Sequence, residues 1–315
     1  MIKPKTLLPG DKVAIVAPSS PILASNLDKA RVSVEALGLE PVFYPSCHLR
    51  HGHLAGEDFQ RAEDVNAAFE NPAIKGIIAL RGGYGTPRLL RRIDFEMIKH
   101  HPKVFLGYSD ITGLHIPLNR LSGLVTFHGP TAYNQTPLYP FNPYTFGWLK
   151  KNLLSDSPLG LYEAPAGEPL GALKGGSATG EIVGGNLSLL TAALGSEYEV
   201  DTRGKILFIE EVHEYHSVMD RMLMSLELSG KFKDAAGVIL GTFHGCRAET
   251  GYQDKVDLPL DTIFKEILAP YEFPVLTNFR AGHVSPQFTI PLGVKVRIDA
   301  DMKTVEFLES ATLRD

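Results

Sequence analysis

The sequence predicts an α/β protein of two domains, because of its length, the alternation of its elements and a change of pattern in its middle. The chain has 315 residues, and a single core usually stops growing at roughly 250–300 residues. In the first half, short apolar runs alternate with amphipathic stretches, which is typical of βαβ units with a mainly parallel sheet and helices on both faces. The second half is richer in short strands, which favours a smaller, mixed α/β or barrel-like domain.

The first half begins with a β-branched run at residues 13–17, closed by Pro18-Ser-Ser20, which predicts a buried strand. Further strands are predicted at 41–44, 76–80 and 104–106, and helices at 27–37, 58–69, 86–93 and from about Asp110. Active sites of such sheets lie at the carboxyl ends of the strands. Two turns at these ends have unusual sequences, Arg81-Gly-Gly-Tyr-Gly85 and Gly107-Tyr-Ser-Asp110.

The middle of the chain reads as a connection between domains. From Gln135 to Gly176, Pro and Gly recur every few residues around one helix, predicted at 146–154. We therefore expect a first domain at 1–135, a linker at 136–176 and a second domain at 177–315. The second domain has predicted strands at 205–209, 237–240, 294–298 and 304–307, and predicted helices at 186–194, 217–229 and 260–268.

Composition excludes several classes of protein. Hydrophobic residues make up 44% and charged residues 21% of the chain, so intrinsic disorder is excluded. The net charge is −5, from 31 Lys and Arg against 36 Asp and Glu, whereas nucleic-acid binders normally have a basic surplus. Two cysteines, Cys47 and Cys246, form no disulfide framework. No apolar run is long enough for a membrane span, and Asp11 interrupts any signal peptide. We expect a cytoplasmic protein with no nucleic-acid or membrane partner.

One turn has the features of a nucleophile elbow. Residues 107–112 directly follow a predicted strand and open a helix, so the hydroxyl of Ser109 would project clear of the sheet. The amide of Asp110 would lie where a helix dipole and free N–H groups stabilise an oxyanion. Ile111 replaces the second Gly of the G-x-S-x-G pattern. The alternative is that Ser109 and Asp110 only cap the helix.

The Gly-rich turn at residues 81–85 would lie beside that serine and could supply a second backbone amide. It could also bind a dinucleotide, although G-x-G-x-x-G is not satisfied and the turn follows the third strand, not the first. A tight turn without a ligand is the third interpretation.

A nucleophilic serine needs a base, and the base needs a group that orients it. His283 lies in a loop before a strand-like run that ends at Pro291. Glu210 and Glu211 end an apolar strand, where a carboxylate needs either a partner or solvent. A Ser, Glu, His order is admissible because triads are defined by geometry. The residues alone thus lead to a serine hydrolase as a hypothesis.

Two histidine groups resemble metal sites only superficially. Cys47 and the histidines that follow it, His48, His51 and His53, lack standard zinc spacing. His213 and His216 do not satisfy H-E-x-x-H. We predict no metal and no cofactor.

The ordered motifs resemble the LD-carboxypeptidases, the serine peptidase family that contains muramoyltetrapeptide carboxypeptidase and the microcin C self-immunity peptidases. The resemblance rests first on residues 105–112 with 81–85 and covers nearly the whole chain. The other motifs that carry it lie at residues 9–19, 54–56, 126–130, 184–190, 206–212, 220–223, 282–283 and 291–293.

The resemblance implies a triad of Ser109, Glu210 and His283, with the amides of Gly83 and Asp110 as oxyanion donors. It also implies a Rossmann-like N-terminal domain, a C-terminal domain with small β-barrel character, and a homodimer. The known reaction removes terminal D-Ala from murein tetrapeptide, at an amide between an L-centre (diaminopimelate or Lys) and a D-residue. Cytoplasmic members of the family serve cell-wall recycling.

The substrate is the part of the hypothesis with most alternatives. A free terminal carboxylate needs a cation or N–H donors, and Arg81 and its neighbour Tyr84 are the candidates by position. Residues 212–219 depart from the family pattern, so the same chemistry on a peptidyl-nucleotide antibiotic is an alternative. A non-catalytic nucleotide-binding sensor built on residues 81–85 is the other.

Overall fold

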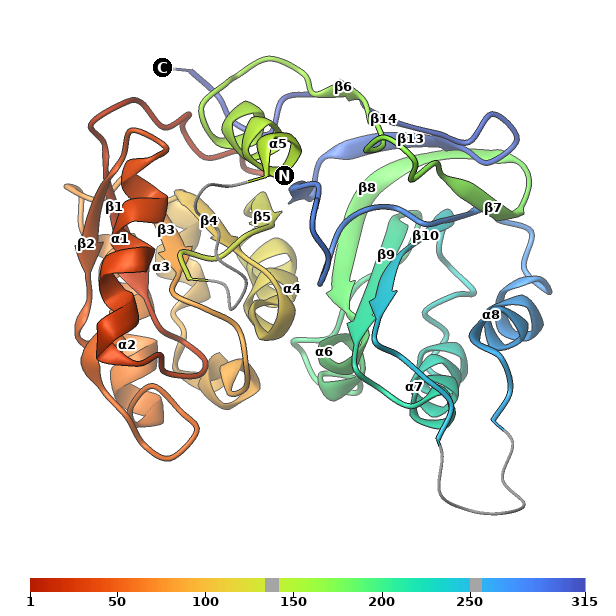
Figure 1. Ribbon diagram of the computed structural model, residues 1–315, viewed down its shortest axis with the longest axis horizontal. Helices are drawn as coiled ribbons and strands as arrows, with labels where there is room; N and C mark the ends of the chain where they lie inside the picture. Colours follow the sequence, from red (N-terminus) through yellow and green to blue (C-terminus); the bar gives the residue numbers. More distant parts are fainter. Residues whose placement is uncertain (134–141, 250–256, 315) are drawn as a thin grey trace.

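The first half of the chain folds around a mostly parallel sheet (Figure 1). The structure is a computed structural model that describes residues 1–133, 142–249 and 257–314. The strand order is β12-β5-β4-β3-β1-β2; β1 to β5 are mutually parallel and β12 is antiparallel to β5. These strands are β1 (Lys12–Val16), β2 (Glu40–Phe43), β3 (Gly76–Ala79), β4 (Val104–Gly107), β5 (Thr126–His128) and β12 (Ile290–Leu292).

Helices cover both faces of this sheet because alternate residues of each strand point to opposite sides. In β1, Val13 and Ile15 join one buried cluster, which includes residues of α1 and α5. Ala14 and Val16 join another, which includes residues of α2, α3 and α4. The helices are α1 (Leu27–Glu35), α2 (Asp58–Glu70), α3 (Phe95–His100), α4 (Thr112–Leu121) and α5 (Pro143–Leu153).

The second half is built on a mixed, eight-stranded sheet of order β6-β14-β13-β8-β9-β10-β11-β7. The central strands β8 to β11 are parallel, and the outer pairs are antiparallel. The strands are β6 (Gly160–Leu161), β7 (Gly171–Lys174), β8 (Ser177–Asn186), β9 (Ile206–Val212), β10 (Gly237–His244), β11 (Val275–Thr277), β13 (Lys295–Asp299) and β14 (Thr304–Phe307). The helices are α6 (Leu187–Ala192), α7 (His216–Leu228) and α8 (Leu260–Leu268).

Several elements differ from the sequence prediction. The helix predicted at 86–93 is a 3₁₀ helix, Thr86–Arg92, with Pro87 in its first turn. The segment predicted as a linker contributes β6 and β7 to the second sheet. The predicted boundary between residues 135 and 136 lies outside the described residues, so the division into 1–135, 136–176 and 177–315 stays a prediction.

The two halves meet directly beside the carboxyl ends of their central strands. The backbone N–H of Asn186, at the end of β8, donates to Oγ1 of Thr112 at the start of α4 (3.1 Å). At the neighbouring Gly185, an added Cβ would lie 2.5 Å from the same oxygen. The strand β12 also returns from the second half to pair with β5. These contacts bring the turn after β4 next to the end of β9.

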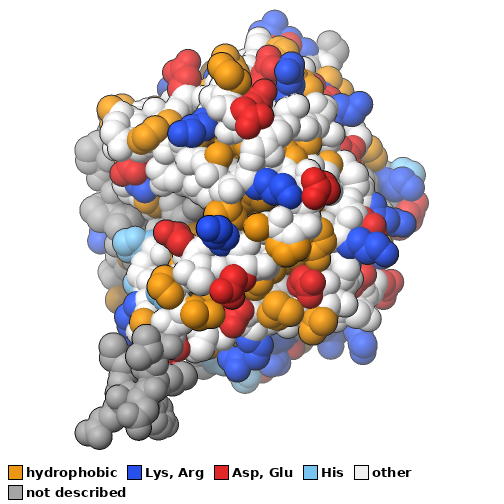
Figure 2. Space-filling model, turned by 90° about the vertical axis from the view of Figure 1, so that its right-hand side faces the viewer, with side chains coloured by type: hydrophobic (Ala, Val, Ile, Leu, Met, Phe, Trp, Pro, Cys, Tyr) orange, Lys and Arg blue, Asp and Glu red, His pale blue; other side chains and the backbone are white. Residues whose placement is uncertain are grey.

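The surface carries charges of both signs. On the face in Figure 2, acidic and basic side chains are interspersed among apolar ones. No helix within the described ranges combines the length and the apolar character that crossing a bilayer would require.

Candidate active site

Ser109 lies on a sharp turn between β4 and a 3₁₀ turn that leads into α4. Its φ is +65°, a left-handed backbone conformation that non-glycine residues seldom adopt. Strain of this kind persists where the surrounding structure holds it, and a nucleophile elbow is one such place. The turn is also closely packed, because an added Cβ at Gly82 would lie 2.9 Å from Cβ of Ser109.

The structure brings Ser109, His283 and Glu210 together in one hydrogen-bonded chain. Nε2 of His283 lies 2.9 Å from Oγ of Ser109, and Nδ1 of His283 lies 2.7 Å from Oε2 of Glu210. The glutamate is completely buried, and the imidazole has a side-chain exposure of 17%. This is the nucleophile, base and orienting acid arrangement of a serine hydrolase.

The two glutamates at the end of β9 have separate surroundings. Successive side chains of a strand point to opposite faces, so only Glu210 faces His283. Glu211 accepts hydrogen bonds from the Asn186 amide (2.9 Å) and from the backbone N–H and hydroxyl of Ser188 (2.8 and 2.7 Å). Glu211 therefore satisfies the N-terminal groups of α6.

The contact between Glu210 and His283 stabilises the charged form of each side chain. Burial by itself would raise the pKa of Glu210, but the charge of His283 and its hydrogen bond hold that pKa below its ordinary value. Burial would likewise lower the pKa of His283, but the charge of Glu210 raises it above its ordinary value. Both directions favour a carboxylate that stabilises an imidazolium.

A buried carboxylate and a buried guanidinium fix the loops around the serine. Oδ2 of Asp110 accepts hydrogen bonds from the hydroxyl of Ser19 (2.5 Å) and the backbone N–H of Thr86 (3.0 Å). Arg61 is completely buried and donates to the carbonyls of Pro18 and Gly85. The ends of β1, β3 and β4 are thus tied into one rim. Sequence reasoning missed Arg61, whose role depends on tertiary contacts alone.

Ser109 and His283 open into a hollow of about 750 Å³ between the two halves. Arg81 and Gly83 also line it, whereas Tyr84 is not among the lining residues and is 55% exposed. The Gly83 amide has no hydrogen-bond acceptor among the described residues. The lining side chains that sequence reasoning missed include Tyr133, His244 and Arg280.

Comparison with known proteins identifies the family. The LD-carboxypeptidase N-terminal domain matches residues 13–129, and the LD-carboxypeptidase C-terminal domain matches residues 179–298. The chain belongs to the LD-carboxypeptidase family. It is 40% identical over 302 residues to a Bacillus subtilis protein named "Probable murein peptide carboxypeptidase", covering 96% of this chain and 93% of that one. It is 31% identical over 290 residues to murein tetrapeptide carboxypeptidase of Pseudomonas aeruginosa, covering 90% and 91%.

Solved structures of LD-carboxypeptidase relatives have the same fold. The microcin C7 self-immunity protein MccF matches with a TM-score of 0.87 and 27% identity, over 99% of both chains. Muramoyltetrapeptide carboxypeptidase from Oxalobacter formigenes matches with a TM-score of 0.80 and 27% identity, over 94% of this chain and 97% of that one. The predictions of family, of the two-domain α/β fold and of a serine LD-carboxypeptidase are confirmed.

The other histidines of this LD-carboxypeptidase have individual environments. His216, at the start of α7, donates its Nδ1–H to the carbonyl oxygen of Leu258 (3.0 Å). His213 lines the hollow and packs edge-on against His244. Across the described part of the chain, no group of three or more His, Cys, Asp and Glu side chains is placed to hold a metal ion.

His128 lies behind the glutamate, inside the protein. Its Nε2 is 3.9 Å from Oε1 of Glu210, and both side chains are completely buried. Burial lowers the pKa of His128 to about 4, so the ring is neutral at neutral pH. Glu210 therefore faces one imidazole that can become charged and one that stays neutral.

Proposed function

We propose that this LD-carboxypeptidase releases terminal D-Ala from murein tetrapeptide, by cleaving the amide between an L-centre and the D-residue. The observation that carries the proposal is the hydrogen-bonded chain from Ser109 through His283 to Glu210, with distances of 2.9 and 2.7 Å. It is supported by relatives that are named murein peptide and murein tetrapeptide carboxypeptidases.

The proposed reaction begins with attack by Ser109. His283 takes the proton of the hydroxyl as its oxygen bonds to the scissile carbonyl carbon, and then gives that proton to the leaving amine of D-Ala. Glu210 holds the imidazole by Nδ1 and stabilises its positive charge. Water, deprotonated by His283, then releases the peptide from the acyl-enzyme. The enzyme returns to its starting state, so the three side chains are the catalytic residues of the proposal.

The amides of Gly83 and Asp110 are the proposed oxyanion donors. The amide of Asp110 follows the nucleophile directly, and Gly83 lines the same hollow as Ser109. Each such donor contributes about 10²–10³ in rate. We propose that Arg81 binds the terminal carboxylate of D-Ala, because it is half-buried in the same hollow. We propose that Tyr84, which belongs to the same turn, contacts the substrate from the outer rim. A cytoplasmic location, a role in cell-wall recycling and a homodimer also remain proposals.

The deciding experiment is mass spectrometry of purified tetrapeptide incubated with the purified protein. We expect D-Ala and tripeptide as products, and loss of nearly all turnover in Ser109→Ala, whose fold should be unchanged. A matched control is Ser122→Ala, which removes a hydroxyl whose only hydrogen bond among the described residues is to the carbonyl of Phe95 (2.8 Å). Full activity of Ser109→Ala contradicts the mechanism.

Likeness to MccF favours a peptidyl-nucleotide as the second candidate substrate. MccF has been solved in a complex with aspartyl sulfamoyl adenosine, with a TM-score of 0.88 to this chain. The same incubation with that compound decides between the two. Cleavage of it, with no D-Ala released from tetrapeptide, contradicts the murein proposal in favour of the second candidate.

A further inference from the structure

Several buried polar atoms behind the triad have no hydrogen-bond partner. Oε1 of Glu210 and both ring nitrogens of His128 are buried and make no hydrogen bond with any of the described residues. Nε2 of His128 and Oε1 of Glu210 lie 3.9 Å apart, and both side chains are completely buried. The side-chain amide of Asn186 donates to Glu211 (2.9 Å), not to this oxygen. Buried polar atoms are nearly always paired, so an unpaired oxygen this close to an unpaired nitrogen needs an explanation.

The ring of His128, at the end of β5, is held by aromatic packing. It lies edge-on to Phe208, with ring centroids 5.3 Å apart, and to Tyr108, at 6.1 Å. Because burial keeps this imidazole neutral at neutral pH, it carries a single N–H. With that proton on Nδ1, the lone pair of Nε2 would lie next to a carboxylate oxygen, which repels it. The carboxylate therefore favours the proton on Nε2.

A second buried imidazole, that of His115 in α4, cannot supply the missing donor. Its ring centroid lies 6.2 Å from that of His128, and burial keeps it neutral as well. Its single N–H is on Nε2 and donates to the carbonyl oxygen of Gly107 (2.8 Å), which leaves its Nδ1 as an acceptor. His115 thus stabilises the end of β4, whereas His128 has a free N–H.

We propose that His128 is a positioning residue of the triad, whose Nε2–H donates to Oε1 of Glu210 and so holds Oε2 toward His283. The inference rests on the proposed function, in which Glu210 orients the catalytic base. Each oxygen of the carboxylate then has its own imidazole. The separation of 3.9 Å is about 1 Å longer than a hydrogen bond, and hydrogen bonds of an active site often tighten only when substrate is bound.

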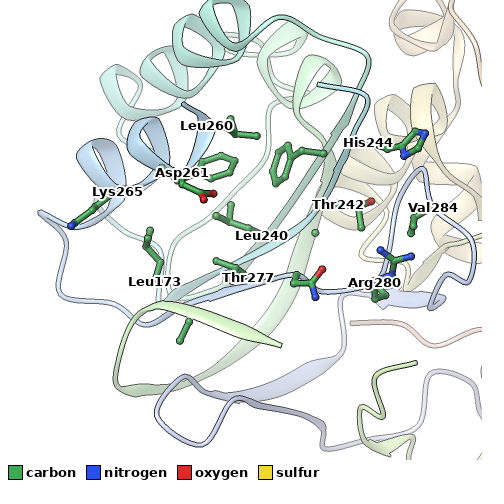
Figure 3. A pocket seen from close by; sticks show the side chains of 15 residues that line it. Leu173, Leu240, Thr242, His244, Leu260, Asp261, Lys265, Thr277, Arg280 and Val284 are labelled. Atoms are coloured by element: carbon green, nitrogen blue, oxygen red, sulfur yellow. The ribbon is translucent and has the colours of Figure 1, made fainter. Parts of the chain in front are cut away.

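The other titratable and charged groups near the pair lie on β9, on the turn of the nucleophile, or around the hollow. They are Glu211, Tyr108, Cys246, His213, His244 and Arg280. Figure 3 shows His244 and Arg280 at the same end of a neighbouring hollow, which they line together with that of Ser109. His128 lines neither hollow. All six groups stay unchanged when His128 is replaced, so a change in the pH profile reports on His128.

The test replaces the imidazole with and without an N–H donor. His128→Leu removes the donor, so kcat for D-Ala release should fall by about 10- to 100-fold, the range for a hydrogen bond to a charged group, with KM nearly unchanged. The acid limb of the kcat/KM profile, where His283 becomes protonated, should move to higher pH, because a carboxylate that loses a donor increases the proton affinity of the pair. His128→Gln keeps an N–H donor on a side chain of similar reach and should retain most of kcat and the position of the limb.

His115→Leu is the matched control, because it removes the other buried imidazole and leaves His128 in place. It should lower the temperature of thermal unfolding without moving the acid limb, since packing alone does not change the proton affinity of the pair. The inference is overturned if His128→Leu keeps both kcat and the limb, or if His115→Leu moves the limb as far. It is also overturned if folded His128→Gln is as impaired as His128→Leu.

The protonated nitrogen of His128 can be observed without any change in activity. In ¹⁵N NMR spectra of the unmodified protein at neutral pH, we expect a neutral imidazole with its proton on Nε2, whose signals disappear in His128→Gln. A proton on Nδ1 of this ring overturns the inference, even where a variant does not fold.

Labelling by a fluorophosphonate probe separates failure of the two proposals, because it reports the reactivity of Ser109 without a murein substrate. If Ser109 is labelled but no D-Ala is released, the murein proposal fails, and a 10- to 100-fold loss of the labelling rate in His128→Leu, or its absence, decides the inference. If Ser109 is neither labelled nor active, both proposals fail. If D-Ala is released equally fast by His128→Leu, with the same acid limb, the proposed function stands and only the role of His128 is wrong.

Discussion

Glu210 and His283 form a buried pair, with Oε2 of the glutamate 2.7 Å from Nδ1 of the imidazole. The two residues reach each other from different elements, the end of β9 and the loop that follows β11. The approach requires Gly282, where an added Cβ would lie 2.5 Å from Oε2 of Glu210. The protonation state of this pair therefore makes the activation of Ser109 depend on pH.

The first prediction concerns the pH profile of kcat/KM. The base must be neutral to accept a proton, and the charge of Glu210 raises the pKa of His283 above its ordinary value of about 6.5. Activity should therefore rise with pH through an acid limb that lies above about 6.5. Glu210→Gln removes the charge, so the acid limb should move to lower pH while kcat falls by on the order of 10³–10⁴.

A pH series of initial rates on both proteins checks this prediction. An acid limb below about 6 in the unmodified protein, or a limb that moves to higher pH in Glu210→Gln, contradicts the assignment of the pair. A control substitution is Glu211→Gln. Glu211 bonds the start of α6 and does not contact His283, so its loss should reduce stability and shift the limb far less.

Gly82 is predicted to be essential for the position of the nucleophile. An added Cβ there would lie 2.9 Å from Cβ and 3.2 Å from Oγ of Ser109. Gly82→Ala should therefore displace the hydroxyl and lower kcat by about 10²-fold, which is the effect of a misplacement of about 1 Å. Steady-state kinetics on the folded variant measure the loss.

Gly147→Ala is the control for that substitution. Gly147 is an exposed residue within α5, and an added Cβ meets nothing within 4 Å. Its replacement should leave kcat unchanged and stabilise the protein by about 0.5–1 kcal/mol, because alanine favours a helix interior. Equal kinetics of the two variants would show that the turn tolerates a side chain.

Much of the fold was predictable because its signals are local. The β-branched run of β1 predicts a strand, and α8 has the predicted bounds of 260–268 because its apolar residues repeat with helical spacing. Ser109 was also predictable, since a strand, a small polar turn and a helix are adjacent in sequence. These features need no knowledge of distant residues.

The strand β8 was missed because glycine normally disfavours strands. Its glycines serve tertiary contacts: an added Cβ at Gly184 would lie 2.0 Å from the carbonyl oxygen of Phe208, and one at Gly185 would meet Thr112. The residues alone did not distinguish Glu210 from Glu211, since that depends on which face of β9 the loop at residue 283 covers; only the family resemblance pointed to Glu210. Arg280 gave no sequence signal, because the hollow that it lines exists only after folding.

Asp110 is predicted to stabilise the fold through the loops it holds. Its carboxylate accepts bonds from Ser19 and Thr86 and is 2% exposed. Both bonds fall on Oδ2, and Asp110→Asn leaves only a neutral oxygen to accept them, so the free energy of unfolding should fall by about 1–3 kcal/mol because hydrogen bonds to charged groups are the stronger ones. Urea denaturation measures this loss. Asp234→Asn, at an exposed position, should change it by less than about 0.5 kcal/mol, and equal effects of the two substitutions would contradict the prediction.

Arg81 is predicted to bind the terminal carboxylate of the substrate. It lines the hollow of Ser109, and its only hydrogen-bond acceptor among the described residues is the carbonyl oxygen of Pro21, 3.4 Å from Nη1. A carboxylate that leaves water for this hollow needs a cation or N–H donors to replace its lost hydration. The interaction exists in the bound substrate and in the transition state alike, so Arg81→Ala should raise KM by about 10- to 100-fold with kcat nearly unchanged. Arg91→Ala, which removes an exposed arginine of the adjacent 3₁₀ helix, should leave both constants as they are.

A tetrapeptide amidated at its C-terminus adds a second check on Arg81. It should be a poor substrate of the unmodified protein, and Arg81→Ala should not lower its rate of cleavage further. If the amidated and free peptides are cleaved equally well, Arg81 has no role in recognising that carboxylate.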